Sequence, residues 1–319
     1  MTHARARRRP RLVALIVGVT LVGVAGVGTL PAAAAPSPTP TPAPTPRIVG
    51  GTPVGKTALP ALAAIMIDDP TAPVRSNLVC SGAVIAQQWV LTAGHCSEVA
   101  LFGLPLMVQV GSRDLGGTAA IKVPVDSVVV NRTFFNKGPG SDVSIFHLTS
   151  PVTVPLSVLA TTADTQLTAA GVNVTTAGWG FTKKVGLGEQ PRGLPAKRAH
   201  SLSLPLIDDA TCTSVFADIS PKYFVPATDL CAGSEGKSPC FGDSGGPMYA
   251  TNATGGLVQI GVTSRGAGCA TKLFPGIFTD VWALRDWITK FTTKPCKRKV
   301  AIFDPGDPDA PPTIPLFVC

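Results

Sequence analysis

Short apolar runs separated by turn residues occupy most of the chain. From Ile48 to about Thr279, runs rich in Val, Ile, Leu and Thr are broken by Gly, Pro, Asn and Asp. Such runs are typical of the strands of an all-β barrel or sandwich. The clearest lie at 62–67, 83–86, 89–92, 107–110, 125–130, 143–148, 172–177 and 257–263.

One long segment near the C-terminus has a helical period instead. Apolar residues recur three or four positions apart at Val281, Leu284, Ile288 and Phe291. Charged side chains occupy the opposite face, and Thr279 or Asp280 can cap the start. We therefore expect an all-β domain closed by a C-terminal helix.

The first 47 residues differ in composition from the rest. A basic start leads into an apolar, Gly-rich run at 12–30, followed by Pro31 and four alanines. This order predicts a secretory signal peptide over 1–34, and a membrane anchor is the alternative because the run is nearly long enough to span a bilayer. Ala32 and Ala34 supply a small-x-small cleavage pattern, which favours the signal peptide. We expect residues 35–47 to be a Pro-rich propeptide with an extended, polyproline-like backbone that ends in the activation site.

The distribution of charge argues against a nucleic-acid partner. The chain has 27 Lys plus Arg residues, 19 Asp plus Glu residues and a net charge of +8. Residues 1–47 contain six arginines and no acid, which leaves 21 basic against 19 acidic residues in the remainder. The excess of basic residues therefore lies mainly in residues 1–47, and the remainder of the chain is nearly neutral.

The cysteines indicate an oxidising compartment. All eight follow residue 47, in the part of the chain that is expected to be exported. They are Cys80, Cys96, Cys212, Cys231, Cys240, Cys269, Cys296 and Cys319. An even number in an exported chain predicts four disulfides, although spacing alone does not choose the pairs. A structural zinc site is disfavoured because no Cys-x-x-Cys spacing is present and histidines are few. We expect no metal and no cofactor.

Ser244 has the strongest local signal for chemistry. It lies in Gly-Asp-Ser-Gly-Gly-Pro at 242–247, and glycines on both sides allow backbone N–H groups to lie beside the hydroxyl. A G-x-S-x-G pattern also occurs in α/β-hydrolases, where the acid and the histidine follow the serine. Every histidine here precedes Ser244, which excludes that alternative.

His95 is the best candidate for a general base, because it follows a predicted strand and a Gly turn beside a cysteine. His147 lies within an apolar run and is interpreted as structural. His200 lies among polar residues and is interpreted as a surface residue. Asp142 precedes an apolar strand after a Gly-rich loop, so its carboxylate is a candidate for orienting an imidazole, although an Asp in this position is commonly a turn residue.

Together these segments resemble the trypsin/chymotrypsin-like serine peptidases. The matching segments are IVGG at 48, WVLTAGHC at 89, DVSIFHL at 142, AGWG at 177, LCAG at 230, CFGDSGGP at 240 and PGIFTDV at 275. The resemblance implies a peptidase domain over 48–292 with two perpendicular six-stranded antiparallel β-barrels and an active site between them. We expect the remainder, 293–319, to be a solvated, disulfide-tethered extension that packs against this domain.

The resemblance also implies roles for single residues. Ser244 is the implied nucleophile, His95 the base and then the acid, and Asp142 the group that orients the imidazole. The N–H groups of Gly242 and Ser244 form the implied oxyanion hole. The implied disulfides are Cys80–Cys96, Cys212–Cys231 and Cys240–Cys269, which leaves Cys296 and Cys319 as the fourth pair.

Activation is a further implication of the resemblance. Cleavage after Arg47 would free the ammonium group of Ile48, which in this family pairs with the acid before the nucleophile, here Asp243. A buried carboxylate without a partner is costly, so the uncleaved precursor is expected to hold the oxyanion loop in an unproductive conformation.

Specificity is implied by the expected pocket residues, Ser238, Ser264, Gly266 and Gly276. Trypsin-like members have Asp where this chain has Ser238, so we expect a preference for large apolar side chains. Glu235 and Lys237 lie close in sequence and leave a trypsin-like or altered specificity as the alternative. Arg265 stands where the family usually has Trp and suggests affinity for acidic peptides.

The expected partners follow from these roles. They are protein or peptide substrates, a separate trypsin-like activating protease and a protein inhibitor, with no nucleic acid, and the enzyme is expected to be monomeric. The leader is typical of a secreted bacterial protein, actinobacterial in particular. The alternative function is a catalytically inert binding module on the same fold.

Overall fold

The computed structural model describes residues 48–294, 296–297 and 314–319. These residues belong to one compact unit that spans 45–319. The predicted signal peptide, the spacer and Arg47 lie outside the described residues, as do residues 298–313 of the extension.

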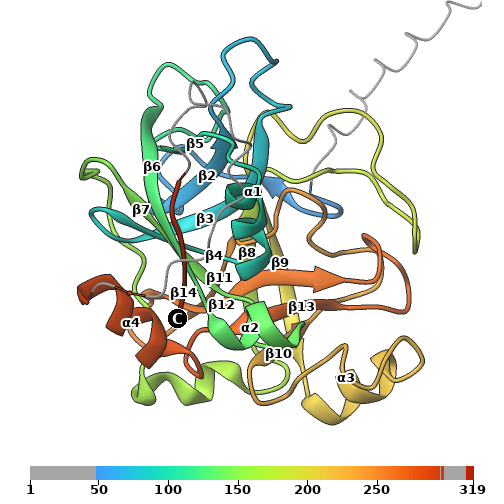
Figure 1. Ribbon diagram of the computed structural model, residues 1–319. Coiled ribbons are helices and arrows are strands. Elements are labelled where there is room, and N and C mark those ends of the chain that lie inside the picture. Colours follow the sequence, from blue (N-terminus) through green and yellow to red (C-terminus); the bar gives the residue numbers. More distant parts are fainter. Residues whose placement is uncertain (1–47, 295, 298–313) are drawn as a thin grey trace, which may run out of the picture. The chain divides into compact units, whose positions relative to one another are not determined.

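The first barrel is a closed sheet of six antiparallel strands (Figure 1). Around the barrel these are β2 (Leu62–Ile67), β3 (Leu78–Ala86), β4 (Trp89–Thr92), β7 (Ser144–Leu148), β6 (Ile121–Val130) and β5 (Leu106–Val110). Pairing of β5 with β2 closes the ring. The alternation of buried and less buried positions along β6 reflects one face packed on the core, as expected for a barrel strand.

The second barrel has the same strand number and is closed by pairing of β8 with β9. Its strands are β8 (Asn173–Gly178), β9 (His200–Ile207), β10 (Asp229–Ala232), β13 (Gly276–Asp280), β12 (Leu257–Gly266) and β11 (Pro247–Thr251). The short strand β1 (Thr52–Pro53) adds to β9. The prediction of two six-stranded antiparallel barrels is therefore confirmed.

The helices are short and lie outside the barrels. They are η1 (Gly94–Ser97), α1 (Glu98–Leu101), α2 (Arg132–Lys137), η2 (Thr162–Thr168), α3 (Asp209–Phe216) and α4 (Arg285–Thr293). The expected C-terminal helix is α4, but it begins later than its apolar period suggests. Asp280 Oδ1 accepts the N–H groups of Trp282 and Ala283, which favours turns at 281–284 before the helix. In the part of the chain that the structure describes, we find no helix with the length and apolar character needed to cross a membrane.

The end of the C-terminal extension forms an additional strand. Strand β14 (Leu316–Val318) pairs in parallel with β6, and Figure 1 shows it in dark red beside that strand. Ile314, Leu316 and Val318 are buried in the core of the first barrel. Residues 314–319 therefore pack against the domain as expected, but the expectation that they are solvated is wrong, because three of their side chains are buried in the barrel's core.

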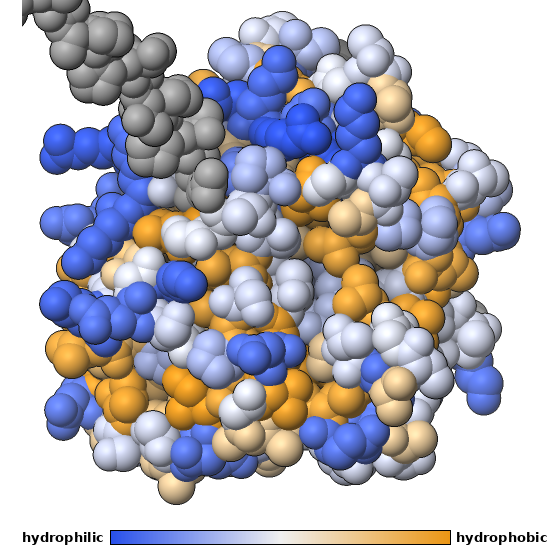
Figure 2. Space-filling view, turned by 180° about the vertical axis from the view of Figure 1, so that it is seen from behind, coloured by the Kyte–Doolittle hydropathy of each residue, from blue (hydrophilic) through white to orange (hydrophobic). Residues whose placement is uncertain are grey.

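Four disulfides bind the described chain together. They join Cys80 to Cys96, Cys212 to Cys231 and Cys240 to Cys269, the three pairs that the family resemblance implies, and Cys296 to Cys319, the pair that was left over. On the outer surface, Figure 2 shows small apolar groups scattered among hydrophilic ones on the face opposite to that of Figure 1. Such a mixture is ordinary, because more than half of a folded protein's accessible area is apolar.

Candidate active site

Ser244 lies in the loop between β10 and β11, and this loop is fastened to both barrels. The N–H of Ser81 donates to the Ser244 carbonyl at 2.8 Å, and the N–H of Gly245 donates to the Thr263 carbonyl at 2.7 Å. Gly245 has a φ of +77°, and a Cβ there would lie 1.9 Å from Thr92 Oγ1. Only glycine fits this position, so the glycine after the serine fixes where the hydroxyl stands.

His95 and Asp142 are brought together by strand pairing in the first barrel. His95 follows β4 within η1, Asp142 precedes β7, and the two strands pair through Thr92 and Ser144. His95 Nδ1 lies 2.9 Å from Asp142 Oδ2, and the N–H of His95 donates to Asp142 Oδ1 at 2.9 Å. The two contacts fix both the position and the direction of the imidazole ring.

The electrostatics of this pair favour its charged form. Burial would lower the pKa of His95, but the negative charge and the hydrogen bond of Asp142 outweigh burial, so the pKa lies above its ordinary value. Burial likewise opposes ionisation of Asp142, yet His95 and hydrogen bonds lower the pKa of this carboxyl below its ordinary value. The imidazole can therefore take up a proton next to a carboxylate that remains ionised.

Two hydroxyl groups of the second barrel hold Asp142 from the other side. Ser264 Oγ donates to Asp142 Oδ2 at 2.6 Å, and Thr279 Oγ1 donates to the Asp142 carbonyl at 2.7 Å. The sequence placed Ser264 only in the substrate pocket. Its contact with Asp142 was missed because it joins residues far apart in the chain.

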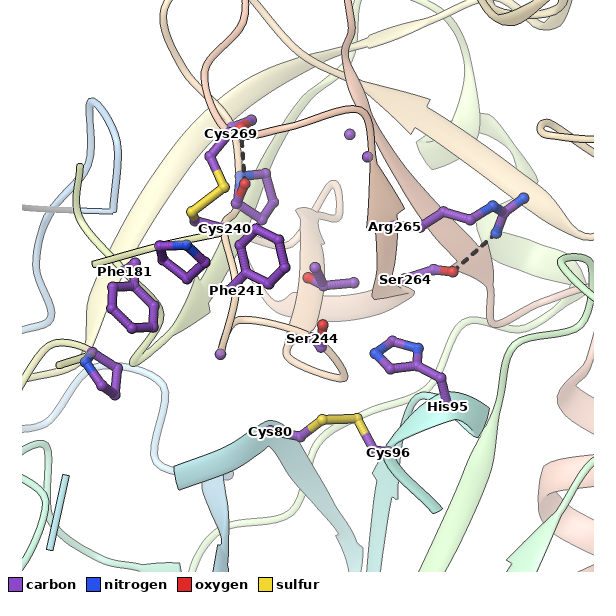
Figure 3. A pocket seen from close by; sticks show the side chains of 18 of the residues that line it. Cys80, His95, Cys96, Phe181, Cys240, Phe241, Ser244, Ser264, Arg265 and Cys269 are labelled. Atoms are coloured by element: carbon purple, nitrogen blue, oxygen red, sulfur yellow. Dashed lines mark hydrogen bonds between the residues drawn. A yellow bond between two sulfur atoms is a disulfide. The ribbon is translucent and has the colours of Figure 1, made fainter. Parts of the chain in front are cut away.

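The Ser244 hydroxyl lies beside the His95 imidazole in Figure 3. No hydrogen bond joins the two side chains in the described structure. Within the described residues, the N–H groups of Gly242 and Ser244 donate to no acceptor of the chain. Ser81 Oγ donates to the Gly242 carbonyl at 2.9 Å and so restrains this peptide. Two unpaired N–H groups beside a hydroxyl can stabilise an oxyanion.

These groups line a cleft of about 900 Å³ to which both barrels contribute. The disulfides Cys80–Cys96 and Cys240–Cys269 lie on opposite sides of it (Figure 3). Gly266 and Gly276 line the pocket, together with the apolar residues Phe181, Leu194, Pro195 and Phe241. The sequence reasoning missed these four apolar residues, although Phe241 stands inside the serine motif and could have been found there.

Ser238 lines the cleft with a hydroxyl that is already hydrogen-bonded within the chain. It donates to the Pro239 carbonyl at 2.8 Å and accepts the N–H of Ala270 at 2.7 Å. The two neighbouring charged residues do not line the cleft. Glu235 pairs with Lys272 at 3.0 Å, and Lys237 is exposed. This part of the cleft therefore carries no charge.

Asp243 is fully buried behind the serine. Its carboxylate accepts the N–H of Gly180 at 2.8 Å and that of Cys240 at 2.9 Å, and no basic side chain of the described residues pairs with it. Burial raises the pKa of Asp243 to about 7. A Cβ on Gly180 would lie 2.4 Å from the carboxylate, which explains a glycine there. Ile48 is also fully buried.

The other two histidines of the described residues, His147 and His200, do not line this cleft. His147 is in β7, where its Nδ1 lies 2.7 Å from Asp126 Oδ1, in keeping with a structural role. His200 is only 5% exposed, so the interpretation as a surface residue is wrong. It begins β9 and pairs with Pro53 of β1, an interaction that covers it and that local sequence does not reveal.

Comparison with known proteins agrees with this geometry. The family model described as trypsin matches residues 48–288. A protein named trypsin-like protease from Streptomyces glaucescens is 30% identical over 237 residues, which cover 74% of this chain and 78% of that protein. Trypsin iota from Drosophila melanogaster is 31% identical over 213 residues, which cover 66% of this chain and 77% of that protein. Brachyurin from Leptuca pugilator is 28% identical over 244 residues, which cover 76% of this chain and 96% of that protein. The chain therefore belongs to the trypsin family and is a serine endopeptidase.

Proposed function

We propose that the chain cleaves peptide bonds by a Ser-His-Asp triad through an acyl-enzyme. Ser244 attacks the scissile carbonyl while His95 Nε2 takes its proton, and His95 then gives that proton to the leaving amine. Asp142 holds Nδ1 and stabilises the imidazolium. Water, deprotonated by His95, then releases the acyl group. The observation that carries the proposal is the Asp142–His95 pair at 2.9 Å, with Ser244 beside the ring (Figure 3).

The oxyanion is assigned to the backbone N–H groups of Gly242 and Ser244. Both are free to donate within the described residues, and the surrounding loop is held by the hydrogen bonds of Ser81, Gly245 and Thr263. Donors fixed in advance need no reorganisation when charge develops on the carbonyl oxygen, which is the main source of their effect.

Substitution of the triad tests the enzyme function. Ser244→Ala and His95→Ala are each expected to lower kcat by about 10⁴- to 10⁶-fold, with little change in folding. Ser214→Ala, which removes an exposed hydroxyl in α3, is the matched control and is expected to leave kcat unchanged. Hydrolysis by Ser244→Ala at the parental rate would contradict the triad. A folded parent enzyme without hydrolytic activity would favour an inert binding module.

For specificity we propose a preference for large apolar side chains before the cleaved bond. The uncharged, hydrogen-bonded Ser238 and the apolar Phe241 support this preference, because burying a Lys or Arg without a counter-charge is costly. A cleavage profile on a diverse peptide pool tests it. Cuts mainly after Lys or Arg would instead favour a trypsin-like specificity.

We further propose that the protein is exported and matured in two steps. Residues 1–34 act as the signal peptide, 35–47 as the propeptide, 48–292 as the peptidase domain and 293–319 as a disulfide-tethered extension. The four disulfides support an oxidising compartment. A second, trypsin-like protease cuts after Arg47, because a pocket selective for apolar residues accepts Arg47 poorly. Efficient self-processing of the purified precursor would contradict this dependence.

A further inference from the structure

Arg265 lines the cleft at the end of β12, directly after Ser264. Its guanidinium is turned to the second barrel, where Nη2 pairs with Asp229 Oδ2. Nε and Nη2 also donate to the Tyr223 carbonyl at 3.0 and 2.7 Å. Figure 3 shows the Arg265 side chain directed away from the centre of the cleft. The cation is therefore held by the chain itself.

Asp229 is the counter-charge of this arginine. Its side chain is completely shielded from solvent at the start of β10, and Oδ2 also accepts the N–H of Val225 at 2.9 Å. The side chain of Arg265 is 16% exposed. Two charges so far removed from water depend on each other, because loss of either leaves an uncompensated buried charge. This neutralisation weakens the expectation that Arg265 attracts acidic peptides.

The ion pair is joined to the triad through one hydroxyl group. Arg265 Nη1 donates to Ser264 Oγ at 2.9 Å, and Ser264 Oγ donates to Asp142 Oδ2 at 2.6 Å. A serine hydroxyl has a single hydrogen. Because Arg265 can only donate, the Ser264 hydrogen is left for Asp142, and the arginine fixes its direction.

We propose that Arg265 and Asp229 are positioning residues that act on the His95–Asp142 pair of the triad through a hydrogen-bonded series of five side chains, Asp229–Arg265–Ser264–Asp142–His95. Arg265 acts on the Asp142 carboxylate through Ser264, and Asp229 keeps Arg265 in place and neutralises its charge. The inference rests on the proposed triad, since Asp142 is the group through which the outer pair reaches His95.

The charges near His95 and near Asp229 determine the direction in which each substitution should shift the pKa of His95. His95 is faced by Asp142, Glu98 and Arg265, and Asp229 is faced by Arg265 and Asp142. A cation disfavours protonation of a nearby imidazole, whereas a carboxylate favours it. Removal of Arg265 should therefore raise the pKa of His95. Removal of Asp229 should lower that pKa, because the arginine is then uncompensated.

Titration of the His95 imidazole by NMR tests these signs without relying on activity. All variants carry Ser244→Ala, so that no turnover is needed. Arg265→Gln is expected to raise the pKa of His95, and Asp229→Asn to lower it, each by about half a unit. The double variant should fall between the two. Lys222→Gln removes an exposed cation near Tyr223 and, as the matched control, should cause no shift.

Kinetics on the active enzyme separate the charge from the hydrogen bond. Arg265→Lys keeps the cation but replaces the forked donor to Ser264. We expect the acidic limb of the kcat/KM profile to stay in place, while kcat falls about 3- to 10-fold with KM unchanged, as for loss of one hydrogen bond. Substitution of a residue that only stabilises the fold would lower the melting temperature without lowering kcat at constant KM.

Shifts of the same sign in Arg265→Gln and Asp229→Asn, or no shift in either, would overturn the proposal. If Asp229→Asn does not fold, the Arg265→Gln titration decides alone, and a lowered or unchanged pKa of His95 overturns it. These results are distinct from a failure of the triad itself, which would appear as hydrolysis by Ser244→Ala at the parental rate.

Discussion

The buried carboxylate of Asp243 allows a quantitative prediction for a precursor kept uncleaved by Arg47→Gln. Burial raises the pKa of Asp243 from 3.8 to about 7. The folded precursor then binds this proton more tightly than the unfolded chain, so the group lowers stability progressively as the pH rises between these two values. A separation of about 3 units at about 1.4 kcal/mol per unit corresponds to about 4 kcal/mol above pH 7.

Urea unfolding at intervals between about pH 4 and about pH 8 measures this effect. The precursor is compared with the same chain carrying Asp243→Asn, whose amide does not titrate. We expect the precursor to lose up to about 4 kcal/mol more than the Asn variant over this range. The Asn variant also loses one acceptor for the N–H groups of Gly180 and Cys240, but this loss displaces its curve without changing the slope.

Cleavage after Arg47 should remove the effect. We expect the new ammonium group of Ile48 to neutralise Asp243, so the mature enzyme should gain no stability on acidification relative to its own Asn variant. Parallel stability curves for the precursor and its Asp243→Asn variant would contradict this prediction, because they would mean that the buried carboxyl does not titrate in this range.

Three further predictions follow from the site and the extension. Ser238→Asp places a negative charge in the uncharged part of the cleft and should shift the cleavage profile towards Lys and Arg; an unchanged profile would show that Ser238 does not line the specificity pocket. Replacing Cys296 and Cys319 by Ser should lower the free energy of unfolding by about 3 kcal/mol, measured in urea, because the closed loop is lost; undiminished stability would mean that the strand alone holds the extension. Activity of the mature enzyme should fall at alkaline pH as the Ile48 ammonium loses its proton, and an Asp243→Asn enzyme as active as the parent would contradict that pairing.

Local sequence predicted the positions of strands in the first barrel better than the turns that depend on side-chain hydrogen bonds. The run at 62–67 became β2 with the same bounds, because a buried strand needs only apolar residues and turn signals at its ends. The sequence period suggested a helix from Val281, whereas the structure starts it at Arg285. Side-chain hydrogen bonds from Asp280 stabilise the intervening turns, and a hydrophobic period does not report such contacts.

Features that depend on distant residues were beyond the sequence. Strand β14 exists because Leu316 pairs with Val128, almost two hundred residues earlier. The sequence did not predict a role for Asp229, because that role depends on its ion pair with Arg265 in the second barrel. The proposed triad residues could be named from the sequence because each lies in a short motif, whereas the residues that contact them from the second barrel lie outside those motifs.

We propose that Ser244, activated by His95, is the reacting group of the mature enzyme. Mass spectrometry after treatment with a serine-directed phosphonylating reagent tests it most directly, using the chain that starts at Ile48. We expect one adduct per molecule, located on Ser244, absent from Ser244→Ala and formed much more slowly in His95→Ala. A folded enzyme that remains unlabelled, or that is labelled at another serine, would contradict it.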